Sequence, residues 1–134
     1  MTSRIDQALQ FQQTALRLRE ARQELIASNI ANADTPQYQA RDIDFASALK
    51  NALSGQTQTV PMTAGAAQHL GGSSNGSVQG APLLYRSVVQ PSADGNSVDM
   101  NVERAQFAEN TIRHEASLKF VSQQIKDILT VLQG

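Results

Sequence analysis

Residues 28–45 read SNIANADTPQYQARDIDF, and this stretch separates a long helical pattern from the rest of the chain. Residues 3–32 contain no Gly or Pro, and their apolar side chains recur at mixed spacings of three, four and seven. Such spacing predicts an amphipathic helix with a broad apolar stripe. Asn32, Asp34 and Pro36 then end the helix, because these residue types favour turns and Pro cannot continue a helical hydrogen-bond ladder.

The turn that follows has an unusual residue after its Pro. A type II turn needs positive φ at its third position, where Gly is the usual choice after Pro. Gln37 occupies that position here, and a residue with a side chain tolerates positive φ poorly. A type I turn, or modest local strain, is therefore predicted, unless the turn tolerates both geometries.

A second helical pattern near the C-terminus, over residues 99–134, has heptad spacing. Its residues fall at two alternating positions that would face a neighbouring helix in a coiled coil. One position holds Phe107, His114, Val121 and Ile128, and the other holds Thr111, Leu118, Ile125 and Leu132. Both positions are wholly apolar from Leu118 onward, and further apolar residues beside them predict that this helix touches more than one neighbour.

Side chains that cap helices stand ahead of each helical pattern. Ser, Asp and Asn at such places accept hydrogen bonds from the free N–H groups of a first turn. The candidate caps are Ser3 with Asp6, then Asp42 or Asp44 before a short helix ending at Leu53, then Asp99 or Asn101. The carboxylates of Asp42 and Asp44 could also suggest acid–base chemistry, but capping is the better account because a helical pattern follows at once.

The middle of the chain has a different composition. Residues 51–85 contain no Asp, Glu, Lys or Arg and are rich in Gly, Ser, Gln, Asn, Thr and Ala, which is typical of a flexible connector. Residues 83–90 predict a strand, followed by a turn at residues 91–96 and an extended piece through Val98 and Met100. This order is compatible with a small β hairpin.

These patterns predict a mainly α fold, in which long N- and C-terminal helices pack as a coiled-coil-like pair with an irregular middle. Four segments follow from them: a helix at 1–33, a turn and short helix at 34–53, a flexible middle at 54–98 and a helix at 99–134. Two helices alone bury little area against their ordering entropy, and each would leave part of its stripe in water. Assembly with other subunits is therefore expected.

The composition argues against several classes of function. Among 134 residues, 11 are basic and 12 acidic, with no basic stripe, so nucleic acid and anionic membranes are poor partners. The absence of Cys excludes thiol catalysis and disulfides. His69 and His114 do not have metal-ligand spacing. No catalytic, cofactor or metal site is predicted, and neither a signal peptide nor a membrane span is visible.

The residues around the first turn resemble a known family. Residues 31–38, ANADTPQY, are similar to the Ala-Asn-x-x-Thr-Pro-Gly-Tyr signature of bacterial flagellar axial proteins, with Gln37 in place of Gly. Residues 39–45, 94–100 and 103–108, which read QARDIDF, DGNSVDM and ERAQFA, narrow the resemblance to flagellar basal-body rod proteins of the proximal rod. The similarity covers residues 3–53 and 83–133.

The resemblance implies a structural subunit, not an enzyme. It would polymerise through its terminal helices in the proximal rod, transmit torque and line the export channel. Its implied partners are other copies, other rod proteins, the membrane ring and the export gate. It would reach the periplasmic rod through the flagellar type III apparatus without a cleaved signal. The alternatives are another flagellar axial protein or a helical secretion adaptor that does not polymerise.

Subunit contacts are predicted at two places. Around the signature, the amides of Asn29 and Asn32 would either hydrogen-bond across a subunit contact or simply solvate a helix end. An aromatic side chain beside a guanidinium suits an interface, although these aromatics could instead cover the open side of the hairpin itself. The predicted interface residues are Asn29, Asn32, Pro36, Tyr38, Arg41, Phe45, Phe107, Leu118, Val121, Ile125, Ile128 and Leu132.

Overall fold

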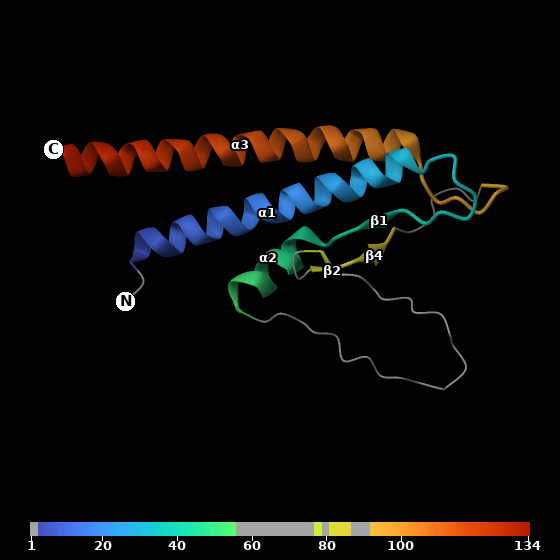
Figure 1. The fold of residues 1–134 in the computed structure, drawn as a ribbon, viewed down its shortest axis with the longest axis horizontal. Coiled ribbons are helices and arrows are strands. Elements are labelled where there is room, and N and C mark those ends of the chain that lie inside the picture. Colours follow the sequence, from blue (N-terminus) through green and yellow to red (C-terminus); the bar gives the residue numbers. More distant parts are fainter. Residues whose placement is uncertain (1–2, 56–76, 79–80, 87–91) are drawn as a thin grey trace.

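A computed structural model of the chain describes residues 3–55, 77–78, 81–86 and 92–134. In chain order, its elements are α1 (Arg4–Ala31), β1 (Arg41–Asp42), α2 (Phe45–Leu53), β2 (Ser77–Val78), β3 (Ala81–Pro82), β4 (Leu84–Tyr85) and α3 (Met100–Gln133). Figure 1 shows α1 and α3 side by side, with α2, β1 and β4 on the side of α1 away from α3. The predicted mainly α fold with paired terminal helices is confirmed.

The first helix begins and ends at the side chains that the sequence indicated. The Ser3 hydroxyl accepts a hydrogen bond from the Ile5 N–H at 3.1 Å, and the Asp6 carboxylate accepts one from the Ser3 N–H at 3.1 Å, which completes the predicted capping box. Asn32 caps the C-terminal end. The 28 residues of α1 span about 42 Å at about 1.5 Å per residue.

The turn after α1 differs from the type I prediction. The Tyr38 N–H donates to the Thr35 carbonyl at 3.3 Å, and Gln37 has a φ of 59°. Because Pro36 cannot adopt positive φ, this combination is that of a type II turn. The prediction of a type I turn is therefore wrong, and its alternative of local strain at Gln37 applies. The Gln37 N–H donates to the Asp94 carbonyl at 2.9 Å, and this contact helps to hold the strained residue.

The short helix α2 covers one face of α1. Asp44, one of the two predicted caps, accepts hydrogen bonds from the Ser47 N–H and hydroxyl, at 3.3 and 2.7 Å. The Ser47 hydroxyl is the main cause of a lowered Asp44 pKa. The core here consists of buried Leu18, Ile43 and Ala48, and the partly buried side chains packed against it are Leu25, Phe45, Leu49 and Leu83.

The β structure consists of two short antiparallel pairs. In one, β1 pairs with β4, with Arg41 opposite Tyr85 and Asp42 opposite Leu84. In the other, β2 pairs with β3. The possible small β hairpin of the middle segment is present as β2 and β3. Residues 84–85 of the strand predicted at 83–90 pair with a segment more than forty residues earlier, and Met100, expected in an extended piece, opens α3 instead. Residues 87–90 of that strand, and most of the predicted connector, lie outside the described residues.

The two long helices run antiparallel and are well packed only near one end of the pair. Figure 1 places the N-terminus and the C-terminus at the same end, where α1 and α3 diverge. The buried residues of α1 lie between Ala15 and Asn29, and those of α3 are Glu103 and Asn110. Residues 4–14 and 111–133 contribute none. The hairpin therefore has a packed base and two weakly supported free ends.

We predict that the isolated chain shows this gradient in solution. Long helices without packing partners are marginal in water, so amides in residues 15–31 and 100–110 should exchange slowly, while those in 4–14 and 118–133 should exchange near the rate of an unfolded chain. Hydrogen exchange measured by mass spectrometry tests this. Circular dichroism should show less helix than two full-length helices would give. Equal protection along both helices would contradict the gradient.

Candidate functional site

A cluster of polar groups joins four segments at the packed base, and we call it the polar junction. It comprises Arg22 of α1, Asp42 of β1, Arg86 after β4, and Glu103 of α3 with Asn29 of α1. Arg22 binds Asp42 through two hydrogen bonds of 3.0 and 3.1 Å and donates to the Gln106 side chain at 2.7 Å. Arg86 donates to Asp42 at 2.8 Å and also pairs with Glu103.

Asn29 has every hydrogen-bonding group of its amide satisfied. Its Nδ2 donates to the Arg41 carbonyl at 2.8 Å and to Glu103 at 3.3 Å. Its Oδ1 accepts from the Arg41 N–H at 3.0 Å and from the Tyr38 hydroxyl at 3.3 Å. An amide offers two donors and accepts two hydrogen bonds, so Asn29 is saturated by its own chain. It is also 0% exposed, and the interface proposed below does not rest on it.

The other predicted residues of the signature are placed differently. Asn32 caps α1, where its Nδ2 donates to the Ser28 carbonyl at 2.8 Å. Phe45 packs on the core, with the Arg19 guanidinium 4.3 Å from its ring centroid. Tyr38 and Arg41 are half-buried and Pro36 is exposed. Pro36 therefore presents the most accessible surface of this group.

Asn96 holds the signature turn from the far side of the sequence. Its Nδ2 lies 2.9 Å from the carbonyl oxygens of Asn32 and Ala33 and 2.8 Å from that of Thr35. These carbonyls belong to the C-cap of α1 and to the turn that follows it. Asn96 is 5% exposed, so the contact is shielded from water. Nothing in the sequence distinguishes Asn96, whose position after Asp94 and Gly95 indicates only a turn.

The buried contact between α1 and α3 is largely polar. The Asn110 Nδ2 donates to the Arg19 carbonyl at 2.9 Å and to the Gln23 side chain at 2.6 Å, while Gln23 donates to Thr111 at 2.9 Å. Glu103 and Asn110 are seven residues apart, the spacing of one heptad position. Because the predicted heptad positions were chosen for apolar residues, they do not include Glu103 and Asn110, although the seven-residue spacing of this pair is visible in the sequence.

The two predicted heptad positions of α3 have different surroundings. His114, Val121 and Ile128 are half-buried, and Ile128 lines a pocket with residues of α1. At the other position, Thr111 is half-buried against α1, whereas Leu118 is 47%, Ile125 45% and Leu132 76% accessible. Together with exposed Phe107 and Leu129, these three residues form what we call the outer face of α3. Leu118, Ile125 and Leu132 continue the heptad position of Thr111, which bonds to Gln23 of α1, so this apolar face flanks the contact with α1 and is left uncovered by it.

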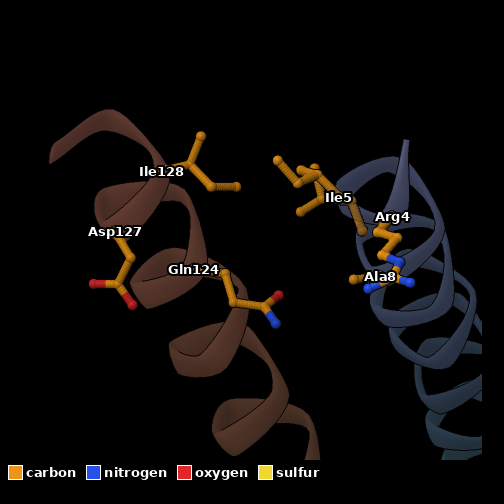
Figure 2. A pocket seen from close by; sticks show the side chains of 7 residues that line it. Arg4, Ile5, Ala8, Gln124, Asp127 and Ile128 are labelled. Atoms are coloured by element: carbon orange, nitrogen blue, oxygen red, sulfur yellow. The ribbon is translucent and has the colours of Figure 1, made fainter. Parts of the chain in front are cut away.

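The free ends of the helices also leave apolar surface uncovered. An open pocket between them is lined by Arg4, Ile5, Ala8, Leu9, Gln124, Asp127 and Ile128. Figure 2 shows Ile5 and Ile128 on facing sides of this pocket. The lining of this pocket comes from residues 4–14 of α1 and 111–133 of α3, which contain no buried residue in the single chain.

Comparisons with known proteins identify the family. A family model described as flagella basal body rod protein matches residues 9–39. Over the whole chain, the flagellar basal body rod protein FlgB of Salmonella typhimurium is 50% identical across 137 residues, which is 100% of this chain and 99% of the relative. The chain belongs to the FlgB family of flagellar basal body rod proteins.

Other FlgB proteins also match over most of the chain. The Escherichia coli (strain K12) protein is also 50% identical over 137 residues, covering 100% of this chain and 99% of its own length. The FlgB protein of Cereibacter sphaeroides is 43% identical over 120 residues, covering 90% of this chain and 89% of its own length. The similarity to the FlgB family therefore extends beyond the signature to α3 and the polar junction.

We predict that the hydrogen bonds of the Asn29 amide stabilise the polar junction. Asn29→Asp keeps the shape of the side chain but removes both donors, leaves the buried Arg41 carbonyl unpaired and sets a carboxylate against Glu103. We expect a loss of about 3 kcal/mol in the free energy of unfolding, since unpaired and like-charged buried groups are costly. Urea unfolding followed by circular dichroism measures it. The exposed Asn101→Asp change should cost much less, and equal losses would contradict the assignment.

The charges of the junction also predict a dependence on pH. Burial by itself raises the pKa of Asp42, but hydrogen bonds from Arg22 and Arg86 outweigh it and hold the pKa below its ordinary value. For Glu103, burial raises the pKa, and Arg86 and Asn29 oppose this only in part. Asp42 thus stabilises the fold above its ordinary pKa and loses this effect as pH falls through its lowered pKa. Glu103 has the opposite dependence, because its raised pKa favours the fold at acid pH.

We therefore expect Asp42→Asn to lower stability at pH 7 and to flatten the decline of stability below about pH 4, the ordinary range of an Asp side chain. Urea unfolding at pH values from 7 to 3 measures both effects. The exposed Asp34→Asn change is the matched control and should keep the acid decline of the natural chain. A variant at position 42 that declines as steeply as the natural chain would refute the role assigned to Asp42.

Proposed function

We propose that this chain, a structural subunit of the flagellar basal body rod, polymerises in the proximal part of the rod through its two terminal helices. The outer face of α3 is the observation that carries this proposal. Exposed Leu, Ile and Phe side chains at heptad spacing on one helix are typical of a surface that packs against another helix. The residues of α3 proposed for subunit contacts are Phe107, Leu118, Ile125 and Leu132 of this face, together with the half-buried Val121 and Ile128.

Polar and apolar residues of α3 serve different contacts in this proposal. Polar hydrogen bonds fix the position of α3 on α1 within the subunit, whereas the apolar outer face is left for neighbours. Burial of a Leu or Ile side chain contributes about 1.5 to 3 kcal/mol, so a few such residues per contact stabilise an assembly. We also propose that Pro36, Tyr38 and Arg41 of the signature lie at a subunit contact, with Asn32 and Phe45 behind them.

The mechanism that we propose is mechanical. Interlocked helices of successive subunits, formed by residues 1–33 and 99–134, would transmit torque and leave a central channel for export. Residues 34–53 would form the turn and the short helix beside them. The partners would be other copies, other rod proteins, the membrane ring and the export gate. We propose no chemistry for the chain, because the half-buried carboxylate of Asp42 and the buried one of Glu103 are held in ion pairs with Arg86.

The chain is a component of the flagellar basal body, and we propose that it lies in the periplasmic rod after export by the flagellar type III apparatus without a cleaved signal. In the part of the chain that the structure describes, no helix is long and apolar enough to cross a membrane.

Substitutions on the outer face of α3 test the proposal. Leu118→Asp and Ile125→Asp each place a carboxylate into the proposed apolar contact, at a cost of several kcal/mol if it is buried. In a flagellated host lacking its own copy, both variants should be made at normal levels but build no rod, so the cells lack hooks and do not swim. Electron microscopy of isolated basal bodies and motility in soft agar measure these outcomes.

Ala116→Asp is the matched control, because Ala116 is exposed on the same helix but lies off both heptad positions. It should swim normally. Normal swimming of the Leu118→Asp and Ile125→Asp variants would contradict the proposed contact. Counting the copies of the chain in each basal body distinguishes this proposal from the adaptor alternative. Several copies on a helical lattice would support a polymer, whereas one copy per complex would support an adaptor.

A further inference from the structure

Arg86 connects two carboxylates that belong to distant parts of the chain. Its Nη2 donates to Asp42 Oδ2 at 2.8 Å, and its Nη1 pairs with Glu103. Asp42 lies in β1 and Glu103 in the first turn of α3, whereas Arg86 directly follows β4. The Arg86 N–H also donates to the Ala40 carbonyl at 2.9 Å, so its backbone is fixed beside the strand pair. One guanidinium therefore ties the β pair to the start of the long C-terminal helix.

The charges of the polar junction balance only while Arg86 is in place. Arg22 and Arg86 carry two positive charges, and Asp42 and Glu103 carry two negative ones. Without Arg86, Arg22 still pairs with Asp42, but Glu103 keeps only the neutral amide of Asn29 at 3.3 Å. The Glu103 side chain is 1% exposed, so water cannot replace the lost partner unless α3 moves away from α1.

We propose that Arg86 is a latch that couples docking of the β4 segment to closure of α1 against α3. Release of β4 would leave the Glu103 carboxylate buried and unpaired, and the base of the helix pair would then open to hydrate it. Docking of β4 would in turn close the base. The two events thus form one cooperative unit within the subunit, whether or not the subunit polymerises as proposed above.

Hydrogen exchange on the full chain tests the latch. Arg86→Met keeps the length of the side chain and removes its charge. We expect exchange to speed up by roughly 10- to 100-fold not only at β1 and β4 but also at residues 22–31 and 100–110, since breaking a buried ion pair from one side is strongly destabilising. The exposed Arg104→Met change in α3 should leave all these rates unaltered. Faster exchange confined to β1 and β4 would overturn the proposal.

A second variant separates coupling from a simple loss of stability. Arg86→Met combined with Glu103→Gln removes the unpaired carboxylate as well as the latch. We expect protection of residues 22–31 and 100–110 to recover relative to Arg86→Met alone, and helix to return by circular dichroism if the single variant has lost it. A double variant that is no better protected than Arg86→Met would show that the unpaired Glu103 is not what opens the base, and the latch would be refuted.

Discussion

The arrangement of this subunit depends on how a buried carboxylate and a buried amide are satisfied where α1 ends and α3 begins. Glu103 and Asn29 are both 0% exposed, and each needs partners that the chain must bring from elsewhere. Arg86 and the Arg41 backbone supply them, and these groups arrive from opposite strands of one β pair. Because leaving either group unpaired is costly, one packing of four segments is selected over others that bury similar apolar area.

A second consequence follows from using polar contacts inside the subunit. Hydrogen bonds of Asn110, Gln23 and Thr111 define how α1 and α3 meet, and they add little apolar burial. Large apolar side chains of α3, among them Leu118, Ile125 and Leu132, remain exposed beside this contact. A polar inner contact fixes geometry, whereas an apolar outer contact contributes free energy when a neighbour covers it. This division suits the assembly through the terminal helices that we propose for the chain.

The signature turn shows the same reliance on distant groups. Gln37 has positive φ, which normally favours Gly, and the strain persists because surrounding contacts hold it. The Asp94 carbonyl accepts a hydrogen bond from the Gln37 N–H, and the Asn96 amide lies within hydrogen-bond distance of three carbonyls just after α1. Hydrogen bonds with residues 92–97 thus help to hold the signature turn in its type II conformation.

The sequence by itself determined the helices, their caps and the family. Ser3, Asp44 and Asp99 act on the first turns that follow them, and heptad spacing is a property of one helix, so local pattern was sufficient for these features. Only the tertiary structure decided which side of α3 meets α1, which segment pairs with β4, and that Arg86, Asn96 and Glu103 have buried partners. Those outcomes depend on contacts between residues 17 to 91 positions apart, and an apolar stripe wider than one contact does not reveal which edge its own chain will cover.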